Sequence, residues 1–548
     1  MAGLAALRSL LKGKRELAWS WAVLCCLLLF VAGVRFRLRE TPLERDEGEY
    51  AYGGQLLLQG VLPGQLLYTM KLPGTHAAYA CLMAVCGESC AGVHLGFLVV
   101  NCATIVLMFW FAQALWGSLA AMAAAATYAL VSLSAETLGT SAHATHFVVL
   151  CAVSGLGLLA HASRTGRLLS FFGSGVLLSC SVLMKHNGVF FAGFGVGWLI
   201  WLGFNRRLGA QWAFAKAGLM FCAGAVAPFL ILSFVLWRAH TLETCWLWSV
   251  SYARAYANAN PGPTLTWRMM MQRMPLVMHL PFYSSIFGVV ALWCRRGSWR
   301  LALLATTFLL CSLAAVVPGW HFRPHYYVLL IPALALLTGS LVQDATKLLG
   351  ACRWRFLAAL PPLVFAFFLA SGLAREWRFF FQLTPLQACR TLYGIDPFPE
   401  AQALGDYIRA HARPEASIAV IGSEPEIYFY AHRHGATGYI YTYPLLERQP
   451  YATAMREQML QEIRSARPQF LAQVRIWTSW QSRPGPQKRV EELCVALTPP
   501  GYRIAGKCTV SPAQTQAAWD WGPVPEDPFG TANELLLFER ESSAGEVH

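Results

Sequence analysis

The sequence predicts a polytopic α-helical membrane protein of about eleven spans with an α/β domain at its C-terminal end. Of its 548 residues, 56% are hydrophobic and only 13% are charged, whereas a soluble protein carries about a quarter charged residues. Apolar runs of roughly 17 to 25 residues, the length that crosses a bilayer, recur up to residue 373. From residue 375 the sequence becomes polar and is interrupted by prolines. We therefore expect a transmembrane domain over residues 1–374 and a second domain over residues 375–548.

Eleven apolar runs are predicted to span the membrane, two of them slightly short. They are Leu17–Val34, Gly92–Leu115, Leu119–Leu133, His143–Ala162, Leu168–Met184, Gly188–Phe204, Trp212–Trp237, Leu280–Cys294, Trp299–Val317, Tyr326–Val342 and Phe356–Leu373. A twelfth run, Thr75–Cys86, is predicted to be a helix at the membrane surface. If it crossed the membrane, every later basic loop would change sides.

The basic residues between the runs predict the orientation, because Lys and Arg of short loops are retained on the cytoplasmic side. They precede the first run and recur at every second loop: Lys12, Lys14, Arg15, Arg164, Arg167, Arg206, Arg207, Arg295, Arg296, Arg300, Lys347, Arg353 and Arg355. This pattern predicts a cytoplasmic N-terminus and an extracytoplasmic C-terminal domain. In this orientation a second basic cluster lies on the extracytoplasmic side, and binding an anion would explain its presence there. It consists of Arg35, Arg37, Arg39, Arg45 and Lys71.

Composition excludes several classes of function. The net charge of +14 comes mostly from the residues that flank the spans, so nucleic acid is not expected as a partner. Most of the sixteen cysteines lie in or near apolar runs, where a free Cys behaves as a small hydrophobe. No C-x-x-C pair occurs, so a structural zinc site is not expected. One disulfide, between Cys494 and Cys508 of the outer domain, is predicted because an oxidising compartment allows it.

The C-terminal domain reads as a small α/β fold. Alternating or apolar segments predict strands at "SIAVIG" (417–422), "GYIY" (438–441), "QFLAQV" (469–474), "GYRIAGKC" (501–508) and "ELLLFE" (534–539). The stretch "PYATAMREQMLQEIRSA" predicts an amphipathic helix. No glycine-rich phosphate loop is present, so nucleotide binding is not supported.

The loop after the first span concentrates charge in a chain that otherwise avoids it. Its sequence "ERDEGEYAYGG" (44–54) has four carboxylates and one arginine within six positions, and "YTMKLPGTH" (68–76) adds a lysine. Such acids are often solvated surface charge. The stretch "YAYGGQLLLQG" between them is amphipathic and suited to lie on the bilayer. We therefore expect acid and base to face each other at headgroup depth.

Four segments in order resemble one family. They are Asp46-Glu47, "MKLPGT" (70–75), "LMKHNGVFFAGFGVGWL" (183–199) and "RPHYYVLLIPALALLTG" (323–339). The set resembles the GT-C type membrane glycosyltransferases of the dolichyl-phosphate-mannose protein mannosyltransferase superfamily, whose bacterial members include the aminoarabinose transferase of lipid A. The resemblance implies an enzyme of the bacterial cytoplasmic (inner) membrane. It would be an inverting hexosyl- or pentosyltransferase that moves a sugar from a polyprenyl-phosphate donor to an envelope protein, lipid or glycan.

The chemistry requires a base for the acceptor hydroxyl and cations for the phosphate leaving group. By the resemblance, Asp46 is the base or the acceptor-positioning carboxylate, with Glu47 beside it. Lys71 would hold the donor phosphate, with Arg45 and Arg323 as further cations. His325 and Tyr326 would line the site from the start of the tenth span. Lys185, at a helix end, is predicted either to contact the phosphate or to extend toward the membrane surface as a solvated charge.

The sequence leaves two alternatives for cofactors: a divalent cation, magnesium or manganese, or none. Many relatives carry a second acid before the fourth span, but this chain has Thr145 at that position, between His143 and His146. Glu136 is the nearest carboxylate. A metal held by Asp46 and Glu136, or by the two histidines, fits the pattern, and a single Asp could suffice for magnesium.

Three other readings compete with a transferase. A transporter or flippase for a lipid-linked glycan would show charged residues at mid-membrane, whereas the ionisable residues here collect at the ends of the spans. A membrane-anchored sensor would not need eleven spans. A glycan polymerase or ligase would use the same donor chemistry on longer chains, so the sequence does not separate it from the leading reading.

Overall fold

The structure is a computed structural model that describes residues 2–205, 211–257, 263–447, 449–480, 487–511, 513–514, 517–522 and 533–541. The chain divides into two compact units. The first comprises Met1–Arg37, Phe97–Leu232 and Ala259–Gln382, and the second comprises Leu38–Gly96, Ser233–Asn258 and Leu383–His548. Arg206 and Arg207, two of the residues that predict the orientation, lie outside the described residues. The domain boundary at residue 375 stays a prediction.

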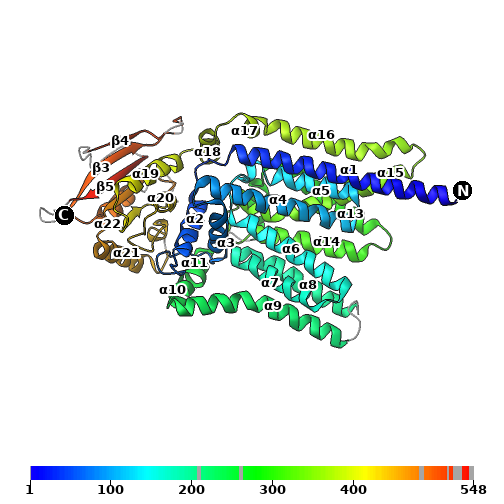
Figure 1. Cartoon of the computed structure of the whole chain (residues 1–548), viewed down its shortest axis with the longest axis horizontal. Coiled ribbons are helices and arrows are strands. Elements are labelled where there is room, and N and C mark those ends of the chain that lie inside the picture. The colour runs from blue at the N-terminus through cyan, green and yellow to red at the C-terminus, as the bar shows by residue number, and fades with distance from the viewer. Residues whose placement is uncertain are drawn as a thin grey trace. The chain divides into compact units, whose positions relative to one another are not determined.

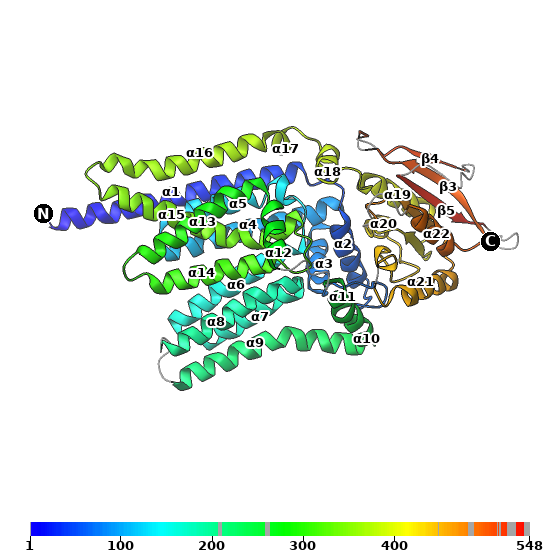
Figure 2. The ribbon, with the colours of Figure 1, turned by 180° about the vertical axis from the view of Figure 1, so that it is seen from behind.

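The first unit is a bundle of apolar helices that run alongside one another (Figures 1 and 2). Its long helices are α1 (Ala2–Arg37), α5 (Ser118–Val131), α6 (Ala144–Thr165), α7 (Leu168–Met184), α8 (Val189–Phe204), α13 (Leu276–Cys294), α14 (Trp299–Val316), α15 (Ile331–Gly350), α16 (Leu360–Arg375) and most of α4 (Cys90–Leu115) and α9 (Gln211–Arg238). Within the described residues, nine helical segments are long and apolar enough to cross a membrane, and α5 and α7 are shorter apolar helices. All eleven predicted spans coincide with these helices, so the polytopic fold is confirmed.

Helix α15 lies at the centre of this bundle. It packs against α5 and α13, and its residues from Ile331 to Ser340 are all buried. Gly339 permits the contact with α5, because an added Cβ would lie 2.5 Å from the carbonyl oxygen of Ala120. Gly288 does the same on α13 against Leu337. Small residues at such crossings let helix backbones approach closely.

The second unit contains a mixed five-stranded sheet in the order β1-β2-β5-β3-β4. Its strands are β1 (Ile418–Ile421), β2 (Phe470–Arg475), β3 (Tyr502–Thr509), β4 (Trp519–Trp521) and β5 (Glu534–Arg540). The pair β1-β2 is parallel and the other pairs are antiparallel. Helices α21 (Ala452–Ala466) and α22 (Gln487–Leu497) cover one face, where residues such as Met459 and Leu471 form the core. The C-terminal α/β domain is thus confirmed.

Five of the six predicted elements of this domain are present, and one prediction is wrong. Residues 438–441 form no strand. The segment is buried, and its Gly438 carbonyl accepts a hydrogen bond of 2.7 Å from the Tyr68 N–H. The Tyr68 ring lies against Gly438, so that an added Cβ would meet it at 2.6 Å. A segment of the first loop therefore packs on residues 438–441, while the nearby Gly435 forms an isolated bridge to Ile418 of β1. The short strand β4 was not predicted.

The predicted disulfide between Cys494 and Cys508 is also absent, because both cysteines are buried free thiols. Cys494 packs in the core with Leu536 and Phe538 of β5. Cys508 pairs across the strands with Leu535. Successive side chains of a strand point to opposite faces, so Leu535 and Cys508 lie on the face away from Cys494. Burial raises the pKa of both thiols to about 12.

The charged loop also belongs to the second unit. It forms α2 (Arg45–Leu58) and α3 (Gly74–Cys86), which pack against each other. Tyrosine hydroxyls link it to the C-terminal part of the chain: Tyr52 accepts from the Gly435 N–H at 2.8 Å, and Tyr430 accepts from the Leu43 N–H at 2.9 Å. The remaining helices of this unit are α10 (Leu242–Trp246), a π-helical turn at Leu247–Tyr252, α11 (Ala253–Ala257), α18 (Pro385–Tyr393), α19 (Phe398–His411) and α20 (Glu426–Ala431).

Candidate active site

The start of α2 positions the acids of the first loop. Glu44 is the N-cap: its carboxylate accepts from the Glu47 N–H at 2.9 Å, and the Glu47 carboxylate accepts from the Glu44 N–H at 3.3 Å. This reciprocal capping box fixes where the helix begins. Asp46 and Glu49, three residues apart, then lie on one helix face. Asp46 and Glu47, adjacent in sequence, point in different directions.

Lys71 lies between Asp46 and Glu49. Its Nζ is 2.7 Å from Asp46 Oδ1 and 2.5 Å from Glu49 Oε2. The Glu49 side chain is fully buried, whereas Asp46 is 17% exposed and Lys71 is 24% exposed. The structure therefore brings together the predicted base and the predicted phosphate ligand. It leaves Asp46 as the carboxylate of this trio that is accessible from outside.

Three side chains besides Lys71 surround the buried carboxylate of Glu49. The Thr69 hydroxyl donates to Oε1 at 2.5 Å, and the Tyr441 hydroxyl donates to Oε2 at 2.7 Å. The His76 Nε2 lies 3.6 Å from Oε1. Tyr50, the next residue of α2, contacts the lysine instead, with its ring centroid 4.4 Å from Lys71 Nζ, a cation–π contact. Glu49 is thus held by hydrogen bonds as well as by Lys71.

Charge pairing outweighs burial in this cluster. Burial alone would raise the pKa of Glu49, but Lys71 and the neighbouring His76 lower it to about 2. Burial would likewise lower the pKa of Lys71, yet Asp46 and Glu49 raise it well above its usual value. Lys71 is therefore a permanent cation and Glu49 a permanent anion near neutral pH. Neither is a proton carrier in that range.

The other predicted acid and base of the loop have structural partners. Glu47 is buried, and its Oε1 lies 3.0 Å from His94 Nε2. The Arg45 Nε donates to the Ser423 carbonyl at 2.6 Å, and its NH2 lies 3.1 Å from Glu424. Together with the capping box, these contacts favour a structural role for Glu47 and Arg45, which is to hold α2 in place. Their predicted functional roles remain untested.

The remaining predicted residues lie in the first unit. Lys185 follows α7, and its Nζ is 3.9 Å from the ring centroid of Tyr326. His325 packs on edge against Tyr326, with ring centroids 4.8 Å apart. The structure thus brings these three predicted residues together. Arg323 precedes them in the chain. The pKa of His321 is lowered to about 4, mainly by burial and next by the nearby charge of Arg323.

The histidines near the start of α6 have different neighbours. His143 stacks on His325 with ring centroids 4.0 Å apart, and their ligand nitrogens lie within 4.8 Å. His146 instead packs against Phe97. Within this unit, His143 is therefore better placed to ligate a metal ion together with His325 than together with His146.

Glu136 fits the predicted metal role poorly. Its Oε2 accepts from the Val277 N–H at 2.7 Å, and its Oε1 lies 3.5 Å from Arg375 NH1. Within the first unit, Oε2 is thus engaged by a backbone amide, and Oε1 faces the arginine cation at a longer distance. Asp46, its predicted partner, belongs to the second unit.

Sequence reasoning missed Glu49, Thr69, His76 and Tyr441 as members of the site. For Glu49 a signal existed, since the i, i+3 spacing from Asp46 places both acids on one helix face. Thr69 and His76 flank Lys71 in the quoted loop segment. Tyr441 had no signal, because 392 residues separate it from Glu49.

Comparison with known proteins supports the fold. No protein-family model and no curated protein matches the sequence. Among solved structures, ArnT from Cupriavidus metallidurans in the apo state covers 95% of this chain and 98% of its own, at a TM-score of 0.54 and 14% identity. The same protein bound to undecaprenyl phosphate covers 83% and 93%, at 0.51 and 16%.

A second solved protein is similar over most of the chain. The archaeal oligosaccharyltransferase AglB from Archaeoglobus fulgidus, in complex with an inhibitory peptide and a dolichol-phosphate, covers 93% of this chain and 74% of its own. Its TM-score is 0.50 at 11% identity. At such identities the likeness concerns the fold. This chain therefore has the fold of the GT-C membrane glycosyltransferases ArnT and AglB over most of its length.

Proposed function

We propose that the chain is an inverting glycosyltransferase of the bacterial cytoplasmic membrane. It moves a sugar from a polyprenyl-phosphate donor to an envelope acceptor on the extracytoplasmic face. The fold supports this proposal, because structures of the similar proteins hold undecaprenyl phosphate and dolichol-phosphate. The peptide bound to AglB is a reason to include proteins among the acceptors, beside lipids and glycans.

One observation carries the proposal: a partly exposed carboxylate, Asp46, is held 2.7 Å from a partly exposed lysine by a helix start and a second, buried carboxylate. Solvated surface acids are not held in this way. A base must reach the acceptor hydroxyl, and Asp46 is the acid of the trio that is exposed. The buried Glu49 keeps Lys71, and through it Asp46, in position.

The proposed step is a displacement at the anomeric carbon. The acceptor oxygen forms a bond to that carbon while its proton passes to Asp46. The bond from the anomeric carbon to the phosphate oxygen breaks, and polyprenyl phosphate leaves with the electron pair. Because this phosphate leaves as a stabilised anion, no protein acid is required.

The charge of the trio limits what Lys71 can do for the donor. Two carboxylates and one ammonium leave one net negative charge, so Lys71 alone does not attract a phosphate strongly. The proposal therefore needs further positive charge. Arg323 and Lys185, with His325 and Tyr326 as polar and aromatic neighbours, are the proposed sources from the protein.

A divalent cation, magnesium or manganese, is the other proposed source. Asp46 is its proposed ligand, since a single Asp together with phosphate and water suits magnesium. When bound, the ion would neutralise charge on the leaving phosphate. Removal with a chelator, followed by addition of magnesium or manganese, tests this part.

The test of the proposed function compares envelope lipids and glycoproteins by mass spectrometry in cells with and without the protein. A mass difference of one sugar identifies donor and acceptor together. Asp46→Asn should not restore the product, because Asn cannot accept the proton. Glu40→Gln is the matched control, since Glu40 is exposed in the same loop.

The result separates the competing readings. No mass difference, or full restoration by Asp46→Asn, would contradict the proposal. Accumulation of a lipid-linked glycan on the cytoplasmic side would favour a transporter or flippase. A change in chain length, rather than one sugar, would favour a polymerase or ligase.

A further inference from the structure

A large groove opens in the first unit between α13 and α16, with α5 and α15 behind it. Its volume is about 600 Å³, within the range of roughly 300 to 1,000 Å³ of small-molecule sites. The walls are mostly apolar side chains, such as Leu280, Val342, Phe365 and Phe368. Helix α16 itself has little protein around it, since only 6% of its apolar window is buried.

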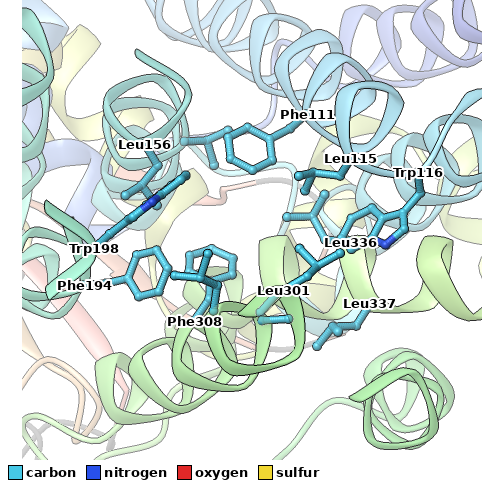
Figure 3. Close-up of a pocket in the computed structure, with 14 residues that line it drawn as sticks. Phe111, Leu115, Trp116, Leu156, Phe194, Trp198, Leu301, Phe308, Leu336 and Leu337 are labelled. Atoms are coloured by element: carbon cyan, nitrogen blue, oxygen red, sulfur yellow. The ribbon is translucent and has the colours of Figure 1, made fainter. Parts of the chain in front are cut away.

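A second apolar cavity in the same unit is a useful contrast. Figure 3 shows Phe111, Leu156, Trp198, Phe308 and Leu336 among the side chains around it. Its volume is about 90 Å³, too small for a lipid chain, and its walls carry no charged group. Its size and lining point to a packing gap between helices rather than a ligand site.

The large groove differs because one end is charged. Arg375, at the last turn of α16, lines it together with His279. Arg375 NH1 lies 3.5 Å from Glu136 Oε1, and the two side chains are 50% and 26% exposed. This distance leaves a loose, accessible ion pair. A cation and an anion thus stand side by side at the end of an apolar groove.

A buried hydroxyl adds a polar point along the wall. Thr338 lines the groove and is 4% exposed. Its Oγ1 has no hydrogen-bond partner among the residues that the structure describes. Thr338 lies deep in the groove, because its neighbour Leu337 packs against Gly288, roughly three helical turns along α13 from the Val277 N–H that Glu136 binds. It therefore lies beside the acyl part of the groove, away from the ion pair.

We propose that this groove binds one glycerophospholipid of the surrounding bilayer with a zwitterionic, phosphate-plus-ammonium headgroup. The phosphate pairs with Arg375 and the ammonium with Glu136, so the headgroup complements both members of the ion pair. The acyl chains fill the apolar groove beside α16. The lipid supplies part of the packing that α16 lacks within the protein.

Charge complementarity favours this lipid over the donor of the proposed reaction. A polyprenyl phosphate carries no cation to pair with Glu136. An anionic phospholipid without an ammonium would satisfy Arg375 but would bring a second negative charge to Glu136. Of these three lipids, the zwitterion alone matches both members of the ion pair.

Native mass spectrometry of the delipidated protein tests the proposal, with phosphatidylethanolamine, phosphatidylglycerol and undecaprenyl phosphate titrated separately. Phosphatidylethanolamine should bind most tightly. Arg375→Ala should weaken it at least about tenfold, because a charge-assisted contact is lost. Arg378→Ala, an exposed arginine three residues on that does not line the groove, should leave it unchanged.

A second pair of variants tests the groove itself. Ser371→Trp places a large side chain into the groove, whereas Ala370→Trp alters a neighbouring exposed position outside its lining. Binding should fall only with Ser371→Trp. Equal binding by Arg375→Ala and Arg378→Ala would overturn the proposal, as would tighter binding of undecaprenyl phosphate that Ser371→Trp removes. These outcomes do not depend on sugar transfer.

Discussion

Glu49 Oε2 lies 2.5 Å from Lys71 Nζ, and this carboxylate is fully buried. Asp46, on the other side of the same ammonium, is partly exposed. The two acids therefore have different roles in the site. Glu49 keeps the lysine in place, and Asp46 meets whatever approaches from outside. The first three predictions below test these roles.

Glu49→Gln should destabilise the protein more than Asp46→Asn does. The substitution leaves Lys71 with one carboxylate in place of two and removes a buried, charged hydrogen-bond acceptor. The expected loss is about 1 to 3 kcal/mol of unfolding free energy. Thermal unfolding in detergent measures it, with Glu40→Gln as the surface control. Equal stability of Glu49→Gln and Glu40→Gln would contradict the role given to Glu49.

Asp46→Asn and Lys71→Ala should differ in their kinetics. Losing the base alone should lower kcat by a factor of about 100 to 10,000 with little change in KM for the donor. Removing Lys71 frees both carboxylates to repel the donor phosphate, so it should raise KM as well as lower kcat. Steady-state transfer with varied donor measures both. Lys216→Ala, an exposed lysine, should behave like the unaltered protein, and an unchanged KM in Lys71→Ala would contradict the prediction.

The pKa of Glu49 predicts an acid-dependent loss of stability. Lys71 and His76 overcome burial and lower this pKa from 4.5 to about 2. A depressed pKa in the folded state gives stability that is complete above pH 4.5 and is lost as the pH falls toward 2. The stability difference between the unaltered protein and Glu49→Gln should therefore narrow over this window. Other buried acids contribute equally to both proteins, so their effect cancels in the comparison. A stability difference that stays constant from pH 6 to pH 3 would contradict the prediction.

The orientation of the chain predicts the behaviour of reporter fusions. Alkaline phosphatase fused after Arg540, the last residue of β5, should be active, because the C-terminal domain is predicted to be extracytoplasmic. Green fluorescent protein at the same position should be dark, and at the N-terminus it should fluoresce. Fluorescence after Arg540 would mean that the number of spans is wrong by one.

The spans could be predicted because each depends on a local property, an apolar run of sufficient length. The same holds for β1, β2, β3 and β5, whose apolar residues are contiguous. The segment 438–441 has a strand-like composition, but Tyr68 from the first loop covers it. The sequence alone does not show which distant segment will pack against these residues. The same limit explains the Cys494–Cys508 error, which depended on the two faces of a sheet.

The candidate site was predictable to a similar degree. Asp46 and Lys71 were expected to face each other, and the structure pairs them at 2.7 Å. Glu47 was expected beside Asp46 in function, but the capping box draws it toward Glu44 and His94. Helix geometry separates neighbours in sequence and unites residues three apart. Spacing could therefore have identified Glu49, whereas Tyr441 required the folded chain.

The hydrogen bond from Tyr441 to Glu49 joins residues 392 positions apart, and this separation sets an order of events during synthesis. A ribosome that adds about 5 to 20 residues per second needs roughly 20 to 80 seconds to reach Tyr441 after Glu49. For that time the first loop has emerged without the partners that complete its surroundings. A newborn chain would therefore carry its acids and lysine at the membrane long before they can act. Transfer would begin only when translation is nearly finished.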